Sequence, residues 1–285
     1  MFLDPQSSVW LWLSLVWGAL WGSFGNVFIS RWPKEQSVVR PASHCDSCGR
    51  PVRWYDNIPI LSYLLLQGKC RDCKASIGIE TPLVELFMGL YSVAIWRHAV
   101  GRGEGDMLSA AAFFFVLFIF GWGLIVASVI DLHHMMLPDT ITIGGTLLGV
   151  ILSALGFGPG LFESVLASVS SFLVISILFI WGYKRLTGTA GMGFGDAKIL
   201  AMIGAFQGVG GSVFALFAGA IQGLLIGGAA VSFGKRRSDE DTRWGKKRVP
   251  FGPFLALGAL ENIFWGKDLV SHYVGLIRNI IEWVV

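Results

Sequence analysis

The chain has 285 residues, of which 54% are hydrophobic and 14% are charged. Together with a mean hydropathy of +0.63, this composition gives more apolar surface than one soluble core can bury, which excludes an ordinary soluble domain. The net charge of +3 is too small to indicate nucleic acid as a partner. The composition predicts a protein whose main solvent is membrane lipid.

The first apolar segment, Val9–Ile29, is long enough to cross a membrane as a helix. No basic region precedes it and no small-residue cleavage site is present, so we expect a retained transmembrane helix and not a signal peptide. Residues 1–30 are therefore assigned to this first transmembrane helix. Its glycines predict close packing against another helix; they are Gly18, Gly22 and Gly25.

Residues 31–80 are polar and contain all four cysteines, which form two Cys-x-x-Cys pairs: Cys45, Cys48, Cys70 and Cys73. Two such pairs at this spacing typically supply four thiolates to a tetrahedral structural zinc ion. Two disulfides or a redox pair are the alternatives, and a reducing cytoplasmic location disfavours disulfides. Because about 50 residues make little core of their own, the metal is expected to stabilise this small domain.

Residues 81–285 are predicted to form a transmembrane bundle, which with the first helix gives about eight spans. The expected spans cover residues 82–98, 108–130, 140–157, 163–183, 198–209, 212–233 and 251–265. The span at 198–209 is too short for a straight crossing at about 1.5 Å per residue, so a partial or broken helix is expected there. The fold class is thus an all-α polytopic membrane protein with a small cytoplasmic zinc-binding domain.

The distribution of basic residues predicts the orientation in the membrane. Residues 31–80 carry eight lysines and arginines and residues 234–250 carry seven, whereas the turns at 156–160 and 207–211 carry none. By the positive-inside rule the two basic segments face the cytoplasm, in agreement with the cytoplasmic zinc-binding domain.

Two acidic residues lie at predicted membrane boundaries on the cytoplasmic side. Asp131 follows the apolar run that ends at Ile130, and Asp196 lies in the glycine-rich segment Gly193–Lys198. Carboxylates at such depth are costly, and two that approach each other share a proton, so that one acts as a base and the other as an acid. This arrangement suits activation of water against an amide. The alternative is that each aspartate caps a helix end.

For three other charged residues of the predicted bundle, the sequence indicates structural roles or leaves two roles open. Asp139 follows Pro138 at a predicted helix start and is expected to cap that helix. Lys198 either stabilises ionised Asp196 or extends its amine to the membrane surface. Glu261 lies within the last predicted span and is expected to pair inside the bundle.

Several motifs together make the chain resemble the bifunctional type IV prepilin peptidases, a family of GxGD membrane aspartyl proteases that also N-methylate their product. The motifs lie at Gly22–Val27, Arg31–Pro33, Trp54–Ser62, Asp131–Asp139, Gly193–Asp196 and Pro250–Phe254. The resemblance implies that Asp131 and Asp196 are the catalytic pair and that S-adenosylmethionine is the methyl donor. It also implies type IV prepilins or type II secretion pseudopilins as substrates, cleaved at the cytoplasmic face of the bacterial inner membrane.

Three other functions fit parts of the pattern. A GxGD protease that cleaves other membrane helices would not need the cysteine segment. A proton-coupled transporter would use paired acids nearer the middle of the bilayer. A binding module would explain the cysteines but not the aspartates. The sequence contains no typical glycine-rich nucleotide loop, so the site of the methyl donor is not assigned.

Overall fold

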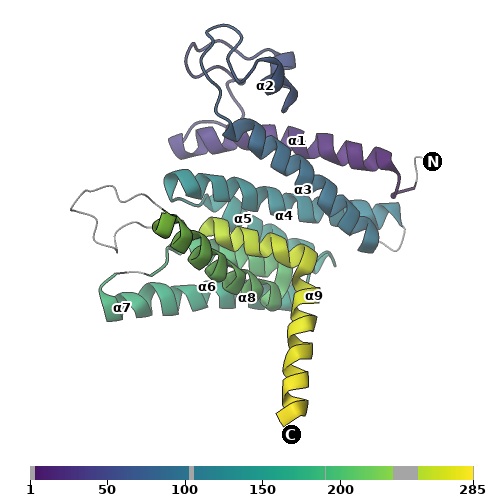
Figure 1. The fold of residues 1–285 in the computed structure, drawn as a ribbon, viewed down its shortest axis with the longest axis vertical. Coiled ribbons are helices and arrows are strands. Elements are labelled where there is room, and N and C mark those ends of the chain that lie inside the picture. Colours follow the sequence, from purple (N-terminus) through teal and green to yellow (C-terminus); the bar gives the residue numbers. More distant parts are fainter. Residues whose placement is uncertain (1–3, 103–105, 190, 234–249, 285) are drawn as a thin grey trace. The chain divides into compact units, whose positions relative to one another are not determined.

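The computed structural model describes the backbone of residues 4–102, 106–189, 191–233 and 250–284. The chain divides into two compact units, Met1–Val126 and Ala127–Val285 (Figure 1). The first contains α1 (Ser8–Arg31), α2 (Leu61–Leu65), α3 (Glu80–Arg102), most of α4 (Met107–His134) and 3-10 turns at Trp32–Lys34 and Trp54–Asn57. The second contains the end of α4, α5 (Asp139–Ala154), α6 (Leu161–Val174), a π-helix (Ile175–Gly182), α7 (Tyr183–Thr187), α8 (Phe194–Phe233) and α9 (Gly252–Val284).

In the first unit α1 packs against α3, and the cysteine segment extends from the ends of these two helices (Figure 1). Glycines allow this close contact: a Cβ at Gly22 would lie 2.7 Å from the Cα of Glu85. Gly25 similarly faces the side chain of Val126 on α4. The predicted helix packing through these glycines is therefore confirmed, and it brings the end of α1 and the start of α3 together.

In the second unit α5, α6 and α9 pack against α8. Helix α8 is broken at Gly208, whose φ of 74° lies in the left-handed region that favours glycine. The carbonyl oxygen of Ala205, next to the break, accepts hydrogen bonds from the hydroxyls of Ser153 (3.2 Å) and Ser164 (2.8 Å). Neighbouring helices thus satisfy backbone groups near the break. The predicted broken helix is confirmed.

Each of the eight expected spans falls on a helix, with 198–209 and 212–233 on the two sides of the break in α8. Within the described residues, five helices are long and apolar enough to cross a membrane, and α5 is a shorter apolar helix. Large apolar side chains lie on the surface, among them Trp12 (68% exposed) and Leu224 (75% exposed). These features establish a helical multi-pass membrane protein. The basic segment expected at 234–250 lies, except for Pro250, outside the described residues.

Candidate active site and metal centre

Asp131 lies in the last turn of α4, and its side chain is buried. The backbone N–H of Gly252, the first residue of α9, donates a hydrogen bond of 3.1 Å to Oδ2 of Asp131. The absence of a side chain permits this approach, because a Cβ at Gly252 would lie 2.7 Å from that oxygen. The positive N-terminal end of α9 therefore faces the carboxyl group.

Asp196 lies in the first turn of α8 and is half-buried. The N–H of Gly193, just before the helix, donates a hydrogen bond of 2.9 Å to Oδ2 of Asp196. This is the backbone contact that an acidic residue in the third helical position makes in a capping box. The short loop before α8 thereby fixes the orientation of the carboxyl group.

The structure brings the two predicted aspartates together in the second unit, where their carboxyl groups interact electrostatically. Leu137 contributes to this arrangement: a Cβ at Gly195 would lie 3.0 Å from one of its methyl carbons, and a Cβ at Gly252 would lie 3.4 Å from the other. The loop after Asp131 thus packs between the glycines at the starts of α8 and α9.

The alternative interpretation, in which each aspartate only caps a helix end, accounts for part of this geometry. Both carboxyl groups accept a backbone N–H at a helix N-terminus, but Asp131 does so for α9 and not for its own helix. Each bond uses one carboxyl oxygen, which leaves the second oxygen of each group to interact with water or substrate. Anchoring by an amide and acid–base chemistry are therefore compatible at both residues.

The expected cap by Asp139 is wrong. Pro138 occupies the N-cap position of α5, and the Asp139 carboxylate instead pairs with Lys198, at 2.6 Å between Oδ1 and Nζ. Lys198 therefore pairs with Asp139 and not with Asp196. The expected pairing of Glu261 inside the bundle is confirmed, because the Gln222 side chain donates a hydrogen bond of 2.6 Å to its carboxylate.

The four cysteines converge in the first unit, and their sulfur atoms all lie within 4.8 Å of one another. All four are free thiols, so the structure contains no disulfide among them. The cluster has the number and type of ligand atoms that a tetrahedral metal site requires.

The two Cys-x-x-Cys turns have the same local construction. The N–H of Cys45 bonds to Arg50 O (2.9 Å), and the N–H of Cys70 bonds to Ala75 O (2.8 Å). Isolated antiparallel bridges, His44 with Pro51 and Lys69 with Ser76, close the two turns. Both pairs have the same Cys-x-x-Cys spacing, and this shared spacing indicates that the two turns are alike. Sequence analysis predicted the convergence of the cysteines but not the similar backbone of the two turns.

The thiols of the cluster differ in acidity. Backbone hydrogen bonds at Cys48 and Ser47 lower the pKa of Cys45 to about 6. The pKa of Cys73 is raised to about 11, because burial and hydrogen bonds with the other thiols outweigh a backbone bond at Ala75. In the metal-free protein at neutral pH, Cys45 is therefore a thiolate and Cys73 a thiol.

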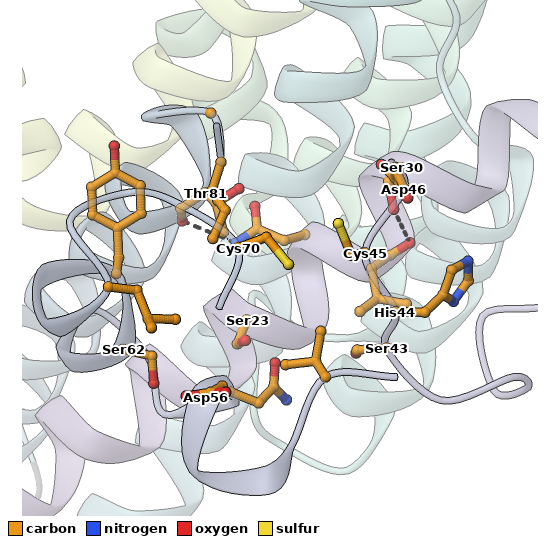
Figure 2. A pocket seen from close by; sticks show the side chains of 18 of the residues that line it. Ser23, Ser30, Ser43, His44, Cys45, Asp46, Asp56, Ser62, Cys70 and Thr81 are labelled. Carbon is orange, nitrogen blue, oxygen red and sulfur yellow. Dashed lines mark hydrogen bonds between the residues drawn. The ribbon is translucent and has the colours of Figure 1, made fainter. Parts of the chain in front are cut away.

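A cavity of about 400 Å³ lies beside the cysteine turns, between them and the ends of α1 and α3. Figure 2 shows side chains from its wall, among them Ser23 and Ser30 of α1 and Cys45, Cys70 and Asp56 of the cysteine segment. Sequence analysis did not predict this cavity. Two sequence motifs contribute residues to its wall, Gly22–Val27 and Trp54–Ser62, and these motifs could have indicated a binding site there.

The structure thus combines a helical membrane fold, a pair of carboxyl groups held by backbone amides, and four cysteines placed so that they could hold a metal ion. A family profile described as Bacterial Peptidase A24 N-terminal domain matches residues 16–99, and one described as Type IV leader peptidase family matches residues 118–228.

Curated relatives are similar over nearly the whole chain. The prepilin leader peptidase/N-methyltransferase of Stutzerimonas stutzeri is 32% identical, over 97% of this chain and 98% of the relative. Proteins of the same name from Pseudomonas aeruginosa (32%, 92% of each chain) and Xanthomonas campestris (34%, 96% of this chain and 97% of the relative) agree. No solved structure matches. The chain belongs to the type IV leader peptidase family.

Proposed function

We propose that this protein removes the leader peptide from type IV prepilins or type II secretion pseudopilins and N-methylates the new N-terminal residue. The observation that carries the peptidase part is the pair of carboxyl groups of Asp131 and Asp196, each anchored through one oxygen to a helix N-terminus. The names of the relatives support both activities.

In the proposed cleavage, one carboxylate of the pair takes a proton from a water molecule that attacks the scissile carbonyl carbon. The protonated partner donates its proton to the carbonyl oxygen. As the C–N bond breaks, the first carboxyl group passes the proton taken from water to the leaving amine, and the partner recovers a proton from the hydroxyl of the tetrahedral intermediate. The amides of Gly193 and Gly252 hold the two groups in orientation, and the apolar bundle strengthens the electrostatic interactions.

S-adenosylmethionine, the proposed methyl donor, supplies a methyl group as its sulfonium becomes a neutral thioether, while the accepting amine releases one proton. Zinc is the proposed metal, because four thiolates suit its tetrahedral geometry. Cys45, Cys48, Cys70 and Cys73 would hold it. With all four positions taken by protein, the metal serves to stabilise the segment.

The proposed location is the bacterial inner membrane, with the cysteine segment and the acid pair on the cytoplasmic side. The eight basic residues in 31–80 support this orientation. The proposed functional division is a first transmembrane helix at 1–30, a zinc-binding domain at 31–80 that serves methylation, and a peptidase bundle at 81–285.

A cleavage assay tests the proposal. The purified full chain in detergent is incubated with a prepilin, with and without S-adenosylmethionine, and the products are weighed by intact mass spectrometry. We expect loss of the leader and, with the donor, a gain of one methyl group. Asp131→Asn and Asp196→Asn should each lower cleavage by about 10²-fold to 10⁴-fold or more.

Glu261→Gln serves as the control, because it removes a negative charge from the same bundle at a residue that bonds to Gln222. It should retain cleavage. Normal processing by either aspartate variant would contradict the assignment. An uncut prepilin with the wild-type protein would favour cleavage of other membrane substrates or proton-coupled transport.

A further inference from the structure

The cavity beside the cysteine turns lies in the first unit and contains neither aspartate of the peptidase pair. Its volume of about 400 Å³ lies in the range of sites that hold nucleoside-sized ligands. Its wall combines polar side chains with apolar ones such as Val27, Ile77 and Leu66. Such a wall suits a ligand that has both a flat apolar ring and charged groups.

The charged residues of this cavity are mostly paired. Arg71 forms a two-pronged bond to Asp56 (2.6 and 2.8 Å), and Arg50 pairs with Asp72 at 3.2 Å. The guanidinium of Arg31 donates to backbone carbonyls, including Pro41 O at 2.7 Å. These groups are therefore engaged in holding the cysteine segment together.

Of the acids that line the cavity, Asp56 and Asp72 pair with arginines and Asp46 is exposed, whereas Glu85 of α3 is buried. Its side chain is 5% exposed, and among the described residues it has no basic partner. Its carboxylate accepts the N–H of Ile60 (2.7 Å) and hydrogen-bonds to the Ser23 side chain. A buried carboxylate without a neighbouring cation is costly, so a cationic ligand in the cavity would be stabilised there.

The partner of Glu85 is itself unusual. Ile60 has a φ of 63°, which is strained for a β-branched residue. Such strain persists where surrounding contacts hold it in place, often at ligand sites. Here the carboxylate of Glu85 bonds to the strained residue at the edge of the cavity, and this joins α3 to the Trp54–Ser62 segment.

We propose that this cavity binds the methyl donor, with the carboxylate of Glu85 facing its positively charged sulfonium or ammonium group. The inference rests on the proposed methyltransferase activity and assigns a site to it. The donor fits the cavity in three respects: its size, its flat adenine ring and its two cationic groups. The remaining polar wall, including Asn57 and Thr81, supplies hydrogen-bond partners for the sugar and the carboxylate.

The test measures binding directly. Titration calorimetry of the purified full chain with S-adenosylmethionine compares the wild type with Glu85→Gln. Glutamine keeps an oxygen that accepts the N–H of Ile60 but removes the charge. We expect the variant to bind the donor at least about ten-fold more weakly. Unchanged affinity would mean that Glu85 acts on Ile60 alone and would overturn the proposal.

Glu80→Gln is the matched control, because Glu80 begins the same helix but is exposed and does not line the cavity. It should bind the donor as the wild type does. If the Glu85 carboxylate instead meets the new N-terminal amine of the pilin, Glu85→Gln will raise the KM for pilin and leave donor affinity unchanged. That result would also overturn the proposal.

A second measurement does not depend on the folding of a variant. Ultraviolet crosslinking of labelled S-adenosylmethionine to the wild-type protein, followed by peptide mapping, should label peptides within residues 23–85. Labels confined to residues 127–284 would overturn the assignment. Leader cleavage measured on the same preparation separates the two hypotheses, since a protein that cleaves prepilin but labels elsewhere contradicts the donor site alone.

Discussion

The four cysteines lie on loops, whereas the two aspartates lie on long helices. Around the cysteines the regular structure is limited to a 3-10 turn, the five-residue helix α2 and two isolated bridges, so that the thiol geometry depends on what the sulfur atoms bind. Around the aspartates, packed helices place backbone amides against the carboxyl groups. Helix packing therefore orients the carboxyl groups in one unit, whereas in the other the proposed metal would have to fix the positions of the thiols.

Loss of the proposed metal ligands should have the largest effect, and it should affect methyl transfer far more than leader cleavage. In the double variant Cys45→Ser with Cys70→Ser, bound zinc should fall from about one per chain to near zero, because two of four ligands are lost. Methyl transfer and donor binding should be lost with it, while leader cleavage should fall much less. Elemental analysis and the two activity assays measure this. Unchanged zinc content would contradict the four-thiolate site.

A single methyl group should damage the aspartate site without affecting the metal. In Gly252→Ala the new Cβ would meet Oδ2 of Asp131, so the carboxyl group must shift, and cleavage should fall by about 10-fold to 100-fold. Gly223→Ala is the control, because there the nearest atom is 3.6 Å away. Cleavage rates and zinc content are measured for both variants. Equal rates would show that the contact does not position Asp131.

The pH dependence of metal binding sharpens the description of the cysteine cluster. Metal binds thiolates, so affinity should fall as pH falls. The thiol of Cys45, with a pKa lowered to about 6, is already ionised at neutral pH, and it adds to the loss below about pH 6. Cys73, with a pKa raised to about 11, must release its proton across the whole neutral range. Competition with a chelator at several pH values measures the slope, and a flat profile would contradict this scheme.

The smallest effect is expected at the ion pair of Lys198 with Asp139. Both side chains are partly exposed, at 29% and 59%, so Lys198→Met should change the free energy of unfolding by less than about 1 kcal/mol. Thermal unfolding and cleavage assays measure this. A loss of cleavage comparable to that of Asp196→Asn would show that Lys198 acts on the proposed catalytic pair after all.

Local patterns predicted much of this molecule. Apolar runs gave the helices, the glycines of α1 predicted its packing, and the spacing of the cysteines predicted their convergence. The contact of Asp131 with Gly252 joins positions 121 residues apart, so no local pattern contains it. The same holds for the pairing of Asp139 with Lys198 and for the cavity, whose walls come from three separate segments.

The contact between Asp131 and the first amide of α9 also has a consequence for biosynthesis. Ribosomes deliver Asp131 and Asp196 to the membrane well before residue 252 is made, so the nascent chain carries both acids while one lacks its amide anchor. The acid pair is therefore completed late, when the final helix inserts. A ribosome stalled before that point would hold a chain with both aspartates present but without the backbone amide that orients Asp131.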